Sequence, residues 1–325
     1  MRKIRAAVAV AAALALVPLS SGTAQAQFSG KPGMIAFVRG GDVHIAAANG
    51  TGVKRLTATA AVESTPKWSP DGKTIAFVRG GYIWTLPAAG GAATRRVEGT
   101  APSWSPDGTH LAYAGVDRDS FIEEQGEQVP CGAFPTINTV ALSAGSQPRT
   151  LVAANAGSAC SWGVTWETYG PTTSWSPDGA RVLYAFGETD DAEELGWRGT
   201  SISETNTWSY GHSRLTEWTK VGDPAHRTPE LDYSPNGANY VFATNAGDPN
   251  RTGRLWVHNR SGTYKKQASP DKDVRFPVYS PTGKQVLYAQ HSRGQQPKLR
   301  LVTLPSSTPK TVLTNASEPD WQRMP

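Results

Sequence analysis

Beyond its N-terminal segment, the chain is dominated by short stretches in which apolar and polar residues alternate, each bounded by Gly, Pro, Asp or Asn. Such alternation puts successive side chains on opposite faces and is typical of β-strands. A hairpin motif, Trp-Ser-Pro-Asp-Gly, recurs at Trp68–Gly72, Trp104–Gly108 and Trp175–Gly179, and degenerate copies begin at Tyr233 and Tyr279. We therefore predict an all-β chain built from one repeated strand-turn-strand unit.

The motif has the residues that a type I turn requires. Pro has a φ close to that of the second position, Asp or Asn tolerates the third position, and Gly takes the fourth. Each copy continues with an aliphatic-aromatic strand, a third alternating strand such as Tyr82–Leu86, and a short fourth strand such as Arg95–Val97. Four antiparallel strands per repeat is the composition of a propeller blade.

The two ends of the chain complete the repeat count. Met34–Gly41 matches Thr74–Gly81 and is a second strand without a first, while Glu318–Trp321 resembles Thr65–Trp68 and supplies the missing strand. We predict a six-bladed β-propeller with four antiparallel strands per blade, its ring closed by N- and C-terminal strands within one blade. The anchoring aromatic residues are those at positions 68, 104, 175, 233, 279 and 321.

A spacing of 71 residues between Trp104 and Trp175 leaves seven blades as the alternative. Only one set of four strands is predicted in this interval, and the excess falls into two loops. The predicted strands are 102–105, 110–115, 136–143 and 149–153.

The W-S-P-D-G hairpin followed by an I-A-F-type strand resembles the PD40 (WD40-like) repeat of TolB-type six-bladed propellers. The resemblance covers nearly the whole chain after the N-terminal segment and implies the fold rather than a function. The resemblance to TolB would imply an α/β domain joined to the propeller. In this chain, however, the first blade begins at about residue 33. The prolyl-oligopeptidase-like relatives have a hydrolase domain after the propeller, but this chain stops soon after Trp321 and has no Gly-x-Ser-x-Gly motif.

The N-terminal segment has the features of a secretory signal peptide. Arg2, Lys3 and Arg5 precede the apolar stretch Ala6–Leu19, and Ala24–Ala26 has the small-x-small pattern of a cleavage site. A short membrane anchor is the alternative. We expect residues 1–26 to be the signal peptide, residues 27–325 to form a single β-propeller domain, and the protein to be secreted or periplasmic.

Charge and histidine spacing restrict the possible partners. The signal peptide holds three of the 32 basic residues, against 27 acidic ones, so the remaining chain has a net charge of only about +2. This balance, without Lys/Arg runs, gives no support for nucleic-acid binding. None of the six histidines has metal-ligand spacing, so we expect no metal and no cofactor. We also expect no membrane span in the mature chain and a monomer.

Insertions are expected on one face only. The Pro-Asp-Gly hairpins are all short, whereas the third repeat inserts residues 116–135 and 154–172 at the opposite face, and the fourth inserts 187–204 and 219–230. Long ordered loops on one face often build a binding site, although passive surface elaboration is the alternative. Cys131 and Cys160 lie in the two insertions of the third repeat, which predicts a disulfide; two free thiols are the alternative.

Aromatic and acidic residues are concentrated in these insertions. Aromatic faces stack on sugars and attract cations, so the combination suits a sugar, a cationic group or a peptide. Packing of the tryptophans and solvation of the acids is the alternative for each residue. Arg39 and Arg79 end equivalent strands and are expected at the channel mouth, whereas Arg227, Lys272 and Arg275 are expected to be solvated. The candidate ligand-binding residues are Trp166, Tyr169, Trp197, Arg39, Arg79, Glu167, Asp190 and Asp191.

These features predict an exported binding propeller that captures a protein, peptide or glycan at the loop-rich face over repeats three and four. The alternative is an extracellular hydrolase or lyase, or a secondary-metabolite tailoring enzyme, using acidic and aromatic residues of the same face. Asp190-Asp191 and Glu193-Glu194 are the carboxylate pairs that general acid-base catalysis would use.

Overall fold

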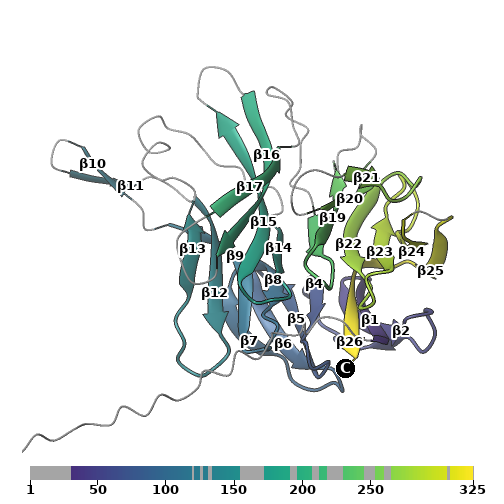
Figure 1. Ribbon diagram of the computed structural model, residues 1–325. Helices are drawn as coiled ribbons and strands as arrows, with labels where there is room; N and C mark the ends of the chain where they lie inside the picture. Colours follow the sequence, from purple (N-terminus) through teal and green to yellow (C-terminus); the bar gives the residue numbers. More distant parts are fainter. Residues whose placement is uncertain are drawn as a thin grey trace, which may run out of the picture.

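The computed structural model describes residues 31–118, 121–124, 127–130, 134–153, 172–190, 196–206, 212–217, 230–244, 253–259, 265–305 and 308–324. Throughout these residues the regular secondary structure consists of β-strands (Figure 1). They include no helix of the length and apolar character needed to cross a membrane. The prediction of an all-β propeller is confirmed.

The strands form four-stranded antiparallel sheets, numbered here along the chain. Sheet 1 consists of β26 (Ser317–Met324), β1 (Lys31–Arg39), β2 (Asp42–Ala47) and β3 (Lys54–Arg55). Sheet 2 consists of β4 (Glu63–Trp68), β5 (Thr74–Arg79), β6 (Tyr82–Pro87) and β7 (Thr94–Glu98). Sheet 3 consists of β8 (Thr100–Trp104), β9 (His110–Asp117), β12 (Phe134–Ala141) and β13 (Arg149–Ala153).

The later repeats have the same strand order. Sheet 4 consists of β14 (Thr172–Trp175), β15 (Arg181–Asp190), β16 (Gly196–Asn206) and β17 (His212–Glu217). Sheet 5 consists of β18 (Glu230–Tyr233), β19 (Asn239–Thr244), β20 (Arg254–Asn259) and β21 (Lys265–Gln267). Sheet 6 consists of β22 (Val274–Tyr279), β23 (Gln285–Gln290), β24 (Lys298–Thr303) and β25 (Lys310–Thr314).

The repeated motif forms the predicted turn between the first two strands of sheets 2 to 6. In sheet 2 the Gly72 amide donates to the Ser69 carbonyl at 2.9 Å, which closes the turn. The Ser69 hydroxyl donates to Asp71 at 2.6 Å and accepts the Thr74 amide at 2.9 Å. The five turn glycines have φ between 67° and 73°, a left-handed conformation that favours glycine.

The aromatic residue at the start of each repeat motif packs into an apolar core between its own sheet and the preceding one. Trp68, for example, lies with Ile45 of sheet 1 and Phe77 of sheet 2, and Trp321 lies with Leu287 of sheet 6 and Phe37 of sheet 1. Burial of large aromatic side chains is the main apolar contribution to such sheet packing. The six aromatics are Trp68, Trp104, Trp175, Tyr233, Tyr279 and Trp321.

The first strand of every sheet is its innermost strand. These strands contact one another in the order β26, β4, β8, β14, β18 and β22, and β22 contacts β26. Hydrogen bonds join several of these steps: the Trp68 amide donates to Asp320 at 2.8 Å, and the Tyr279 amide donates to Asp232 at 3.0 Å. Polar side chains just before the aromatic position thus link consecutive sheets.

Sheet 1 combines the two ends of the described chain, and the C-terminus lies beside this sheet (Figure 1). Strand β26 pairs with β1, with Ile35 opposite Trp321. Gln322 accepts the Met34 amide at 2.9 Å and donates to the Gly72 carbonyl at 3.0 Å. One side chain therefore connects β26, β1 and the first hairpin of sheet 2.

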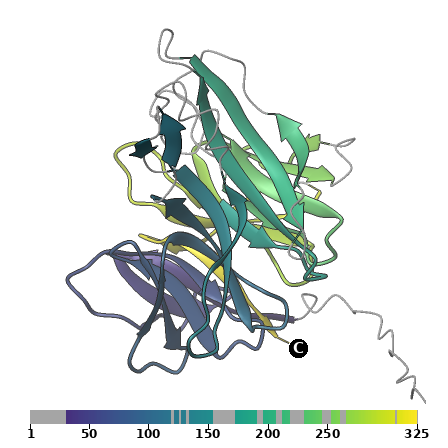
Figure 2. The same ribbon diagram turned by 90° about the vertical axis from the view of Figure 1, so that its left-hand side faces the viewer.

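Two insertions that were expected as loops contain strands. Within 116–135, β10 (Phe121–Glu124) and β11 (Glu127–Pro130) form a separate hairpin that projects from the sheets (Figure 1). Within 187–204, β15 continues to Asp190 and β16 begins at Gly196, so both extend beyond the neighbouring strands (Figure 2). The prediction missed them because polar segments without regular alternation can also pair as strands.

Candidate ligand-binding cavity

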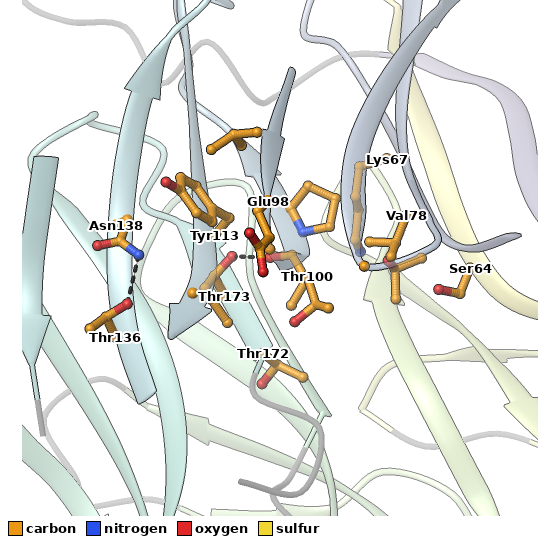
Figure 3. A pocket seen from close by; sticks show the side chains of 18 of the residues that line it. Ser64, Lys67, Val78, Glu98, Thr100, Tyr113, Thr136, Asn138, Thr172 and Thr173 are labelled. Carbon is orange, nitrogen blue, oxygen red and sulfur yellow. Dashed lines mark hydrogen bonds between the residues drawn. The ribbon is translucent and has the colours of Figure 1, made fainter. Parts of the chain in front are cut away.

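A cavity of about 1150 Å³ opens at the ends of the sheets opposite the short hairpins. Its lining comes from the beginnings of innermost strands and from the 2–3 strand connections, with the largest share from sheet 3. Figure 3 shows Asn138 and Thr136 on one side, joined by a 2.7 Å hydrogen bond, and Lys67 and Val78 on the other. The volume is large enough for a small molecule or a short polymer segment.

Six equivalent residues, one from each sheet, line this cavity. Each lies three positions before the aromatic residue of its repeat, so the repeat itself places the six side chains at the same level of the innermost strands. We call this set the mouth ring; it consists of Thr65, Ala101, Thr172, Glu230, Phe276 and Glu318.

Four members of the mouth ring have left-handed backbone conformations, with φ between 47° and 51°. In each case the next residue is proline, as in Thr65-Pro66 and Glu318-Pro319. Proline lacks the N–H that the strand pairing needs and disfavours a helical conformation of the residue before it. The strand pairing is interrupted there, for example between Ser64 and Lys67. At Thr65 and Phe276 these bulges turn the backbone amide toward a glutamate of the neighbouring sheet.

Glu230 links sheets 5 and 6 through one of these bulges. Its carboxylate is 6% exposed, accepts the Phe276 amide and forms an ion pair with Arg275 at 3.0 Å. Burial raises the pKa of Glu230 above its ordinary value, and the Arg275 guanidinium and the Phe276 amide oppose this shift. The expectation that Arg275 is solvated was wrong, because this arginine compensates a buried carboxylate.

Glu318 occupies the equivalent position in sheet 1 and accepts the Thr65 amide at 2.5 Å through Oε2. No ion pair to Glu318 is formed within the described residues. Burial, with a smaller contribution from the Glu230 charge, raises the pKa of Glu318 to about 7, whereas the Thr65 amide, Arg275 and Lys67 act to lower it. The Glu318 carboxyl group is thus partly protonated at neutral pH.

Below the mouth ring the channel narrows to a space of about 40 Å³. Lys67 lines both spaces and forms an ion pair with Asp320 at 3.2 Å. Burial lowers the pKa of Arg323, while the nearby Asp232 and Asp320 carboxylates oppose the shift. These charged groups line the narrow space below the cavity.

The walls of the cavity combine apolar and neutral polar groups. Val78, Val97, Pro102 and Leu231 are apolar lining residues. Burial raises the pKa of Tyr113 to about 12, so its hydroxyl stays neutral. Apolar walls with a few polar groups are typical of ligand sites.

The two arginines predicted at the channel mouth are held by other contacts. Arg79 forms a 2.6 Å ion pair with Glu63, whose side chain is fully buried, and its guanidinium lies over the Trp84 ring. Arg39 donates to the carbonyls of Thr314 and Asn315. Neither arginine is among the residues that line the cavity.

Most of the other predicted site residues cannot be located relative to the cavity. Trp166, Glu167, Tyr169, Asp191, Cys131 and Cys160 lie outside the described residues. Asp190 and Trp197 lie on β15 and β16, whose pairing brings them to the same end of sheet 4. The disulfide and these ligand contacts remain predictions.

The sequence interpretation missed Glu230 and Glu318. A signal was present, because aligning the repeats on the aromatic residue puts both glutamates at the same position. The sequence pattern directed attention to the aromatic and acidic residues of the insertions, so these two strand glutamates were not among the candidate site residues. Among the described residues, no three His, Cys, Asp or Glu side chains come together as a metal site.

The arrangement of small four-stranded antiparallel sheets is that of a β-propeller. The resemblance inferred from the hairpin motif is therefore confirmed at the level of the fold. No protein-family model matches the sequence. No curated protein matches it either.

Solved structures with the same fold include two TolB proteins. The chain is similar to TolB from Acinetobacter baumannii, with a TM-score of 0.62 and 18% identity over 89% of this chain and 66% of that protein. It is similar to a putative TolB from Agrobacterium tumefaciens, with a TM-score of 0.58 and 20% identity over 87% and 89% of the two chains. The tricorn protease matches with a TM-score of 0.51 and 13% identity over 92% of this chain and 35% of that one. The chain thus spans just under two thirds of the Acinetobacter protein, and these identities show the fold alone.

Proposed function

We propose that this protein is an extracytoplasmic binding propeller that holds a protein, peptide or glycan ligand in the cavity above the mouth ring. The observation that carries the proposal is a cavity of about 1150 Å³ with apolar and neutral polar walls, above a narrow space lined by charged groups. Sheet 3 supplies the largest share of its lining, which agrees with a site at the loop-rich face over repeats three and four.

The proposal includes the architecture and the export of the chain. We propose that the six sheets form a closed six-bladed ring, supported by the pairing of β26 with β1 and by the contact of β22 with β26. Residues 1–26 are proposed as the signal peptide and 27–325 as the single domain, with Cys131 and Cys160 as a disulfide. The likeness to TolB structures supports a binding role outside the cytoplasm.

A cavity-filling substitution tests the site. Thr100 is exposed and lines the cavity, so Thr100→Trp should weaken ligand binding at least about tenfold by occupying the space. Lys73→Trp places the same side chain on the hairpin face and is the matched control. Arrays of immobilised peptides and oligosaccharides are probed with the wild type and both variants, and each retained ligand is titrated by calorimetry.

Retention by the wild type and Lys73→Trp with loss in Thr100→Trp supports the proposal. Equal binding by all three proteins, or no retained peptide or glycan, overturns it.

The second candidate function is cleavage of a polymer by a hydrolase or lyase reaction. It is favoured by the presence of Glu230 and Glu318 in one cavity. Burial makes Glu318 a potential proton donor, while Glu230 is held by Arg275. The same glycan array distinguishes the two functions: release of new chain ends by the wild type, lost in Glu230→Gln, would favour the enzyme.

A further inference from the structure

Each cation that lines the cavity is paired with a carboxylate. Arg275 pairs with Glu230, Lys67 with Asp320, and Arg118 with Glu98 at 2.9 Å. Glu318, in contrast, has the Thr65 backbone amide as its hydrogen-bond donor within the described residues. A partly buried carboxylate with one amide donor is poorly compensated when ionised, and a cation from a ligand would supply the missing charge.

The geometry of Glu318 also restricts the shape of that cation. Oε2 already accepts the Thr65 amide, whereas Oε1 has no donor within the described residues and is the more available oxygen. A guanidinium favours two parallel hydrogen bonds to both carboxylate oxygens, whereas an ammonium is a compact point charge that needs one. A single free oxygen therefore favours an ammonium group.

The surroundings of Glu318 fit an aliphatic stem behind the charge. The neighbouring mouth-ring residue Phe276 is partly buried and apolar, and Leu231 and Pro319 also line the cavity. A chain of methylene groups gains free energy by covering such surface while its charged end reaches the carboxylate.

We propose, on the basis of the proposed binding function, that the cavity takes a ligand bearing a primary ammonium on an aliphatic stem, as in a peptide lysine, and that Glu318 is its acceptor. The Lys67 and Arg275 cations are each paired with another carboxylate, which weakens their repulsion of an ammonium at Glu318. The proposal gives the ligand a definite chemical class within the broader set of peptides and glycans.

Binding of this ligand depends on pH through Glu318. The charged groups that act on this carboxyl are Glu230 from β18, Arg275 from β22 and Lys67 from β4, and its pKa is about 7. A lysine ammonium, with a pKa of about 10.4, stays charged up to pH 8. Affinity should therefore increase about tenfold from pH 6 to pH 8, as the Glu318 carboxyl loses its proton.

Three short peptides serve as probes: acetyl-Gly-Lys-Gly-amide, the same peptide with an Nε-acetylated lysine, and the arginine analogue. Calorimetric titration of the full mature chain at low ionic strength should show binding of the lysine peptide and at least about tenfold weaker binding of the acetylated one. The arginine analogue should also bind more weakly. A free Gly-Gly-Gly-amide distinguishes an amino terminus from a lysine side chain as the source of the ammonium.

Glu318→Gln should remove both the binding and its pH dependence. The control Asp71→Asn removes one negative charge on the hairpin face, where sheet 5 already has Asn236 at the same turn position, and should bind like the wild type. The peptide comparison needs no variant and remains decisive if Glu318→Gln is unstable.

Equal affinity for the lysine and acetyl-lysine peptides, or no binding of the lysine peptide, overturns the ammonium proposal. If Thr100→Trp still blocks an array ligand in that case, the binding function stands and only its chemistry is wrong. If Thr100→Trp has no effect on any ligand, the proposed function itself fails.

Discussion

At the scale of single residues, equivalent positions of the repeat have acquired different roles. Arg39 and Arg79 end equivalent strands, but Arg79 compensates the buried Glu63 whereas Arg39 bonds to two carbonyl oxygens. Glu63 also accepts the Val43 amide and the Thr57 hydroxyl, so it joins sheet 2 to sheet 1. The repeat determines where a side chain lies, and its neighbours determine what it does.

Removing the Arg79 side chain should destabilise the protein. Arg79→Ala leaves the fully buried Glu63 carboxylate without its cation, and we expect the free energy of unfolding to fall by about 3 kcal/mol. Arg39→Ala is the control; it removes hydrogen bonds to exposed carbonyls and should cost about 1 kcal/mol. Urea unfolding of both variants measures the difference, and equal losses would contradict the assigned role of Arg79.

At the scale of elements, the Ser-Pro-Asp-Gly hairpin combines local turn chemistry with contact to the next hairpin. An added Cβ at Gly108 would lie 3.6 Å from the Pro70 ring, an ordinary contact. At Gly72 the Cβ would lie 2.6 Å from Gln322 Nε2, because sheet 1 has no hairpin and Gln322 takes the place of proline. Identical turns therefore have different neighbours around the ring.

Alanine at these two glycines should have unequal effects. Both have φ near 70°, so each substitution costs roughly 1–2 kcal/mol of backbone strain. Gly72→Ala also displaces Gln322 from the Gly72 carbonyl and should cost about 1 kcal/mol more than Gly108→Ala. The comparison is made by urea unfolding; a larger loss for Gly108→Ala would refute the proposed role of Gln322.

At the scale of the whole molecule, the strand β26 is needed to complete sheet 1 and to place Trp321 against sheet 6. Without it, β1 and the apolar surfaces of two sheets would be exposed. The stability of sheets 1 and 6 then depends on a contact between residues from opposite ends of the chain.

A chain that ends at Asn315 should lose cooperative unfolding, because β26 is absent and the core around Trp321 is open. Adding a synthetic peptide of residues 316–325 should restore it, since the peptide supplies the same strand. Circular dichroism during urea unfolding, with and without the peptide, provides the measurement. An unchanged unfolding midpoint for the shortened chain would show that β26 is not needed for stability.

Most of the fold could be predicted from particular residues. The four strands of the third repeat were predicted as 102–105, 110–115, 136–143 and 149–153, and the structure has β8, β9, β12 and β13 in those places. Turn residues and alternating patterns act locally, so a single sequence is enough to read them. The paired strands within the insertions were missed, because their sequences are polar and do not alternate regularly with apolar residues.

The sequence by itself determined the strand order, the hairpin turns and the aromatic residues of the inter-sheet cores, because these follow from backbone preferences and from alternation over a few residues. Only the tertiary structure decided which charges are paired and which is not. Glu230 and Glu318 occupy the same repeat position, yet Arg275 compensates one of them, whereas the other accepts a backbone amide and no cation among the described residues. That difference arises from contacts between neighbouring sheets, which join residues far apart in the chain.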